Sequence, residues 1–218
     1  MIKGQFILPI YIDLTAVFLF GVTGGLAALK RGYDVIGLGA LTFVTAVGGA
    51  LIRDGIFISQ GPPAVVRDSR YILVVLLAAL VAFLFRERIV RYNKVIAWFD
   101  ALGLGAYAVV GVEKSLDVGL SVPGAVLVGV INAAGGGLLR DVLVRDEPLL
   151  FKPGQFYILA AFAGCVLFAL LVMQYKLDAT AAALISIGFT FVLRLLAIQF
   201  NWKSPALWQE PPPPPPST

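Results

Sequence analysis

Long apolar runs separated by short polar gaps dominate the chain. Seven runs come near the roughly 20 apolar residues that a helix needs to cross a bilayer; they cover residues 11–29, 35–58, 71–85, 95–112, 120–144, 156–175 and 179–200. Proline-containing gaps at 61–63 and 148–153 and a basic run at 86–94 separate several of them, as is typical of loops. The pattern predicts an all-α integral membrane protein with seven transmembrane helices.

The first half of this pattern recurs in the second half. A shift of 87 residues places Asp13 on Asp100 and the word GGALIRD, residues 48–54, on GGGLLRD, residues 135–141. Five of the seven positions of that word are identical. A three-helix unit has therefore been duplicated, and because three is odd, the second copy enters the membrane from the opposite side. This predicts an inverted repeat, an arrangement that places a pathway near the bilayer midplane.

The repeat also divides the chain. With a shift of 86, Tyr71 pairs with Tyr157 near the start of the third helix of each unit. The first span has a counterpart later in the chain, so we expect it to be retained and not cleaved as a signal peptide. The predicted parts are a first three-helix repeat at 1–93, a second, inverted three-helix repeat at 94–176, a seventh helix at 177–203 and a proline-rich cytoplasmic tail at 204–218.

Glycines lead into both Arg-Asp words. They are Gly48 and Gly49 in the second span, and Gly135, Gly136 and Gly137 in the fifth. Small residues allow membrane helices to approach closely, which is one interpretation. The other is that the glycines bend or break each helix, so that freed backbone carbonyls face a wet interior and transiently hold a dehydrated cation.

The Arg-Asp pairs themselves, Arg53-Asp54 and Arg140-Asp141, lie about one turn inside their helix ends. An arginine at the centre of a membrane helix costs about 2.5 to 3.5 kcal/mol on the insertion scale, and less near the interface. Two interpretations remain open: the pairs form an interhelical lock between the repeats, or they line or gate a polar pathway.

Further polar residues inside the spans are candidates for the same pore or gate. An aspartate that opens a span also suits a helix N-terminus, where its charge meets the favourable end of the dipole, and this applies to both aspartates here. The candidates are Asp13, Thr45, Asp100, Glu113, Lys114 and Asn132.

Composition narrows the function. The chain is 59% hydrophobic and 14% charged, against about 25% charged in soluble domains. It has no histidine, and its single cysteine, Cys165, lies in an apolar run and is expected in the core. The commonest metal ligand is therefore missing and we expect no metal site. A serine-histidine dyad and a zinc-protease site are excluded, and no G-x-S-x-G word occurs. We expect no enzyme, no cofactor beyond a permeant potassium or sodium ion or a bound lipid, and no nucleic-acid partner.

The basic residues indicate the orientation. Of the 14 lysines and arginines outside the spans, nine fall on the side of the C-terminus and five on the side of the N-terminus. By the positive-inside rule the C-terminus is cytoplasmic and the N-terminus lies outside. The tail, WQEPPPPPPST, favours an extended polyproline conformation, either simply solvated or bound by a proline-reading partner.

These residues resemble the prokaryotic TRIC family, relatives of the trimeric intracellular cation channels. The resemblance rests on the two G-G-[AG]-L-x-R-D words, on DALGLGA at 100–106 and on GVEK at 111–114, and it covers about Leu8 to Asn201. It implies two inverted three-helix repeats plus a seventh helix, and a homotrimer in which each protomer has its own pore. The second and fifth helices of the family bend at their glycines and line that pore. Animal members carry a Lys-Glu-Val word where this chain has Glu113-Lys114 in reverse order.

Two functions remain. The first is a potassium-permeable monovalent cation channel in the cell inner (plasma) membrane, surrounded by lipids. The second is a secondary transporter of a small zwitterion such as glycine, a label that the same bacterial domain has also carried. In that case Arg53 or Arg140 would bind the carboxylate and an aspartate would bind the ammonium group.

Overall fold

The computed structural model describes residues 7–91, 93–152 and 156–202, with the side chains of residues 87–95 left out. The described part of the chain is helical, and the elements are α1 (Ile10–Lys30), α2 (Val35–Ile52), the π-helical segment η1 (Arg53–Ile58), α3 (Ala64–Arg67), α4 (Ser69–Arg91), α5 (Asn93–Asp117), α6 (Val122–Leu143), α7 (Tyr157–Met173) and α8 (Ala179–Gln199). The predicted tail at 204–218 lies outside the described residues.

Each predicted apolar run contains a helix, which confirms an all-helical membrane protein. Six helices are long and apolar enough to cross a membrane, and α7, with 17 residues, is a shorter apolar helix. The fourth run was expected to end at Val112, but α5 continues to Asp117. It does so because its polar end is satisfied internally: the Ser115 hydroxyl donates to the Gly111 carbonyl at 2.7 Å, and Lys114 pairs with α1.

Side-chain caps define where several helices begin. Asp34 accepts from the Gly37 amide at 2.8 Å before α2, and Asp178 accepts from the Thr180 amide at 3.0 Å before α8. Ser121 caps α6, which has proline in its first turn. Such caps satisfy amides that a helix leaves without an internal partner. The starts of these three helices are thus specified by the residues next to them in the sequence.

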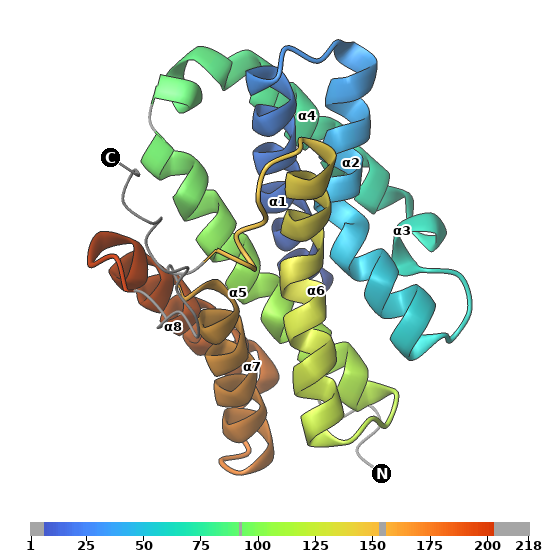
Figure 1. Cartoon of the computed structure of the whole chain (residues 1–218). Helices are drawn as coiled ribbons and strands as arrows, with labels where there is room; N and C mark the ends of the chain where they lie inside the picture. Colours follow the sequence, from blue (N-terminus) through green and yellow to red (C-terminus); the bar gives the residue numbers. More distant parts are fainter. Residues whose placement is uncertain (1–6, 92, 153–155, 203–218) are drawn as a thin grey trace, which may run out of the picture.

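Helices α5 and α6 lie between two groups of helices (Figure 1). Helices α2, α3 and α4 lie on one side, and α7 and α8 on the other. The core of the bundle is α1 and α5, of which 67% and 72% of the spanning window is buried, against 22% for α4. Helix α8 packs on α5 and α7 at the outside, as expected for the helix without a counterpart.

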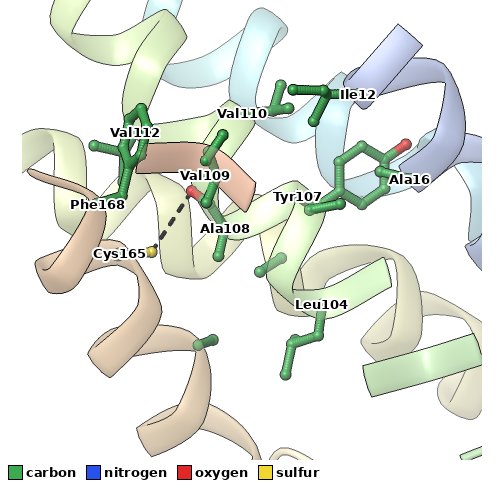
Figure 2. Close-up of a cluster of buried hydrophobic side chains, with 14 of the residues drawn as sticks. Ile12, Ala16, Leu104, Tyr107, Ala108, Val109, Val110, Val112, Cys165 and Phe168 are labelled. Atoms are coloured by element: carbon green, nitrogen blue, oxygen red, sulfur yellow. Dashed lines mark hydrogen bonds between the residues drawn. The ribbon is translucent and has the colours of Figure 1, made fainter. Parts of the chain in front are cut away.

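The interior between α1, α5 and α7 is apolar and tightly packed (Figure 2). The rings of Phe20 and Tyr107 lie 5.4 Å apart, and the Tyr107 hydroxyl donates to the carbonyl of Ala46 in α2. Cys165 is buried and its thiol donates to the Ala108 carbonyl at 3.6 Å. This confirms Cys165 as a core residue.

Candidate functional site

Helices α2 and α6 cross at positions where glycine is required. A methyl group on Gly49 would strike the backbone carbonyl of Asn132, and one on Gly136 would strike the carbonyl of Thr45. The two contacts are equivalent, because Gly49 and Gly136, like Thr45 and Asn132, are 87 residues apart. The crossing therefore uses small residues for close backbone approach, as membrane helices commonly do.

The neighbouring glycines also make equivalent contacts at repeat-related positions. Gly48 faces the side chain of Leu139, and Gly135 faces the side chain of Ile52, which is the matching position of the first half. Both helices stay α-helical through their glycines, α2 as far as Ile52 and α6 as far as Leu143. The structure thus shows close packing at these glycines and no break in either helix. The bend expected there stays a prediction.

Where α2 ends, the first Arg-Asp pair opens a π-helical turn. Arg53 has no exposed surface; its Nε donates to Asp54 Oδ1 at 2.7 Å and its Nη1 to Asn132 Oδ1 at 3.3 Å. Asp54 Oδ2 also accepts from the Ala64 amide at 3.1 Å, which ties the short helix α3 to the pair. Arg53 therefore bonds the other repeat through Asn132 and not through a carboxylate.

Asp13 lies beside this pair and is held by two other helices. Its Oδ2 accepts from the Tyr71 hydroxyl at 2.6 Å and from Lys114 Nζ at 2.5 Å. The adjacent Glu113 accepts from the Leu8 amide at 3.3 Å, just before α1 begins. We call Asp13, Arg53, Asp54 and Lys114 the first charge cluster. Three spans contribute these residues, α1, the α2–η1 helix and α5, and α4 adds the hydrogen bond from Tyr71.

A second charge cluster, Asp100, Arg140 and Asp141, lies at the other end of the bundle. Arg140 Nε donates to Asp141 Oδ1 at 2.9 Å, and its Nη1 donates to Thr23 Oγ1 at 3.0 Å and to Asp100 Oδ1 at 3.3 Å. Asp141 Oδ2 accepts from the Leu149 amide at 3.1 Å. Asp100 is not at a helix N-terminus, because α5 begins seven residues earlier; that interpretation is wrong, whereas Asp13 does lie in the first turn of α1.

The remaining candidates, Thr45 and Asn132, lie at the helix crossing between the clusters. Asn132 is fully buried; it accepts from Arg53, and its Nδ2 donates to the Tyr107 carbonyl at 2.6 Å. The Thr45 hydroxyl donates to the Leu41 carbonyl of its own helix at 2.7 Å. Asn132 therefore links three helices, while the side chain of Thr45 is satisfied locally.

Two polar cavities reach the clusters from opposite ends of α1 and α5. The first cavity, of about 650 Å³, is lined by residues that include Asp13, Asp54, Glu113 and Lys114. At its rim Asp68 accepts three hydrogen bonds from the Arg70 guanidinium and one from the Arg70 amide, which hold the pKa of this carboxyl below its usual range. It therefore stays ionised at neutral pH, with its charge balanced by the ion pair to Arg70.

The second cavity, of about 440 Å³, is lined by residues that include Thr23, Lys30, Arg140 and Asp141. Asp13 and Thr23 are ten residues apart on α1, so the floors of the two cavities are separated by about 15 Å along that helix. The wall between them is formed by buried residues of α1 and by the α2–α6 crossing, with Arg53 at its edge.

Three polar residues beside the clusters, Tyr71, Tyr157 and Thr23, were not among the candidates. Tyr71 and Tyr157 were paired by the repeat, and that pairing was the signal for them. Gly137 leaves room for the Tyr157 hydroxyl, which lies 3.0 Å from the position of an added Cβ. Thr23 has valine at its matching position, Val110, so no pattern marked it.

Comparison with known proteins identifies relatives that cover most of the chain. The family model described as "Glycine transporter" matches residues 10–87 and 97–173. The inner membrane protein YadS of Escherichia coli K12, a UPF0126 protein, is 30% identical over 196 residues, which is 89% of this chain and 94% of YadS. A UPF0126 membrane protein of Deinococcus radiodurans is 37% identical over 155 residues, covering 71% of this chain and 72% of the relative.

Solved structures are similar over most of the chain. A protein from a structural study of conductance through TRIC cation channels superposes with a TM-score of 0.82 at 30% identity, covering 94% of this chain and all of that one. The TRIC trimeric intracellular cation channel orthologue from Rhodobacter sphaeroides gives a TM-score of 0.81 at 30% identity, covering 88% of this chain and 98% of that one.

Fold and matches together define a multi-pass, all-helical membrane protein with buried charge clusters. The chain belongs to the prokaryotic TRIC family, whose sequence model bears the glycine-transporter description. The solved relatives are named as cation channels and not as enzymes, which confirms the prediction that this chain is not an enzyme.

Proposed function

We propose that the protein is a potassium-permeable monovalent cation channel with one pore in each protomer of a homotrimer. The observation that carries this proposal is the pair of polar, carboxylate-bearing cavities that approach each other from opposite ends of α1 and α5. Its main support from comparison is that the similar solved structures are named as TRIC cation channels.

The α2–α6 crossing separates the two cavities and acts as the gate. Arg53 is buried there and bonded to Asn132, and a fixed positive charge opposes the passage of cations. Conduction therefore requires Arg53 to leave this position. The π-helical turn that begins at Arg53 supplies a backbone segment suited to such movement, since π-bulges are common at functional sites.

Bending at the glycines would complete the opening. In this proposal α2 bends at Gly48-Gly49 and α6 bends at Gly135–Gly137, and the exposed carbonyls hold potassium transiently without a resident metal or cofactor. Asp13, Asp54, Asp100 and Asp141 attract the ion on either side of the crossing. Arg53 and Arg140 hold those carboxylates while the pathway is closed.

The arrangement in the membrane follows from the repeat. The reciprocal glycine contacts of α2 and α6 support two inverted three-helix repeats, and so do the matched ranges 10–87 and 97–173, whose starts are 87 residues apart. Seven crossings, including the short α7, place the N-terminus outside and the C-terminus in the cytoplasm. The protein lies in the inner membrane, as the name of the Escherichia coli relative states for that protein.

Recording from purified protein in planar bilayers tests the channel. Discrete unitary currents carried by potassium are expected, together with a trimer on a sizing column. An intact trimer that gives no unitary current under any potassium gradient or voltage would contradict the proposal.

A carrier of a small zwitterion is the second candidate, and the glycine-transporter description of the family model favours it. The first cavity brings Lys114 close to three carboxylates, Asp13, Asp54 and Glu113, so both ends of an amino acid find an opposite charge there. Saturable uptake of labelled glycine into proteoliposomes, without unitary currents, would establish the carrier and exclude the channel.

A further inference from the structure

Helix α8, which has no counterpart in the repeat, carries a buried polar stripe. Ser186, Thr190 and Arg194 follow one another at intervals of four residues and are 0%, 0% and 1% exposed. The opposite face exposes large apolar side chains such as Leu184 and Phe189. A helix that only covered the bundle would need no charge on its inner face, where an unpaired charge is expensive.

Two glycines fix the register of this stripe against its neighbours. A methyl group on Gly105 of α5 would lie 3.2 Å from the Thr190 Cβ, and one on Gly164 of α7 would strike the Thr190 hydroxyl. Thr190 is therefore clamped between α5 and α7. Arg194 follows one turn later on the same face, so the clamp sets its position as well.

The Arg194 guanidinium lies at the second charge cluster. Its Cζ is 4.9 Å from the centre of the Tyr157 ring. Asp100, whose ion pair is with Arg140 at 3.3 Å, lies within electrostatic range of the guanidinium. Asp100 Oδ2 and the Tyr157 hydroxyl are both buried without a hydrogen-bond partner among the described residues. Two such oxygens are costly in an apolar interior unless positive charge lies close by.

The first cluster shows the same composition. It contains two carboxylates, Asp13 and Asp54, one arginine and one further cation, Lys114, which comes from α5, the helix that follows the first repeat. With Arg194 the second cluster has the same formal charge, and its extra cation comes from α8, the helix that follows the second repeat. Each repeat is thus neutralised by the helix that comes next in the chain.

We propose that Arg194 is a positioning residue that supplies the fourth charge of the second cluster and holds Asp100 and the Tyr157 ring beside Arg140. Helix α8 then acts on ion passage through Asp100, although it does not line either polar cavity. This inference rests on the proposed channel function for its effect on transport, and on the geometry alone for the charge pairing.

A double-mutant cycle measured by thermal unfolding of the purified protein tests the pairing. Arg194→Gln and Asp100→Asn should each lower the melting temperature. The fall in the double variant should be clearly smaller than the sum of the two single falls, because residues in one charge network couple. Lys114→Gln with Asp13→Asn is the matched cycle and should couple in the same way. Arg194→Gln with Asp13→Asn combines residues at different clusters, and the two falls in melting temperature should add.

Additive losses for Arg194 and Asp100 would overturn the pairing. If Arg194→Gln alone does not assemble, recovery of the trimer in the Arg194→Gln/Asp100→Asn variant supports it, and failure to recover refutes it. These results do not depend on any transport activity.

Potassium flux into proteoliposomes tests the effect on transport. Arg194→Gln should lower the flux per trimer several-fold, and Arg194→Lys, which keeps the charge, should restore most of it. Wild-type flux in Arg194→Gln would show that the residue only packs. If the wild-type protein itself carries no potassium, the proposed function fails, while the thermal cycle still decides the charge pairing.

Discussion

Identical Arg-Asp words acquire different partners in the folded chain. Arg53 reaches an amide, Asn132, whereas Arg140 reaches a hydroxyl and a carboxylate, Thr23 and Asp100. The difference arises because Lys114 already pairs with Asp13, the residue that matches Asp100. The contacts of each arginine are therefore set by the neighbouring residues in the fold, and not by the Arg-Asp motif alone.

The two repeat-related tyrosines provide a matched test of this asymmetry. Tyr71→Phe removes a 2.6 Å hydrogen bond to the Asp13 carboxylate, and hydrogen bonds to charged groups contribute about 1.5 to 3 kcal/mol. Tyr157→Phe removes a hydroxyl that makes no hydrogen bond within the described residues. We expect Tyr71→Phe to lower the melting temperature more than Tyr157→Phe. Equal losses in a thermal unfolding assay would contradict the assigned hydrogen bonds.

The Asp141→Asn variant tests whether Asp141 lines an ion pathway or forms a structural lock between the repeats. Asparagine keeps an oxygen for the Leu149 amide but removes the charge beside the second cavity. We expect an intact trimer whose potassium conductance is several-fold lower in single-channel recording. Asp34→Asn is the control and should change conductance little, because Asp34 lines neither cavity and asparagine can still cap α2. Loss of the trimer in Asp141→Asn would favour the lock.

At the scale of elements, the pattern of the sequence predicted the apolar helices and their order, since length and hydrophobicity decide them. It missed α3 and the π-helical turn η1, because both depend on tertiary contacts: Asp54 accepts from the first amide of α3. It also ended α5 too early, because Lys114 reads as a loop residue until Asp13 of a distant helix neutralises it.

Glycine substitutions test the α2–α6 crossing. Gly49→Ala forces a methyl group against the Asn132 carbonyl, and such overpacking costs about 1 to 3 kcal/mol. Gly39 lies on the same helix with nothing within 4 Å of an added Cβ, so Gly39→Ala should be neutral or stabilising by up to about 1 kcal/mol. Thermal unfolding measures both. If the two variants melt alike, the crossing is not as close as described.

For the whole molecule, the repeat was readable from spacing, and it identified most residues of both clusters. It could not predict the role of Arg194, which lies outside both copies, nor that of Thr23, whose counterpart is apolar. Thr23 accepts a hydrogen bond from Arg140 of α6, and the role proposed for Arg194 depends on its contact with Tyr157 of α7. No local pattern encodes which faces of distant helices meet.

Labelling of single cysteines tests the predicted orientation. Cys165 is buried and is replaced by alanine as background. Gln60 and Glu147 are both exposed and lie at opposite ends of the bundle, beside the first and second cavities. A membrane-impermeant maleimide added to intact cells should label Gln60→Cys and leave Glu147→Cys unlabelled until the cells are opened. The reverse pattern would invert the topology.

The brevity of α7 has a consequence for the surrounding lipid. Its 17 residues span about 26 Å, less than the roughly 30 Å of hydrocarbon in a typical bilayer. At one end Phe156 and Trp202 pack edge to face with ring centres 5.8 Å apart, an aromatic pair of the kind that settles among headgroups. We therefore expect the bilayer to thin beside α7 where this helix faces lipid, so that acyl-chain length becomes a physical variable to which this flank of the protein responds.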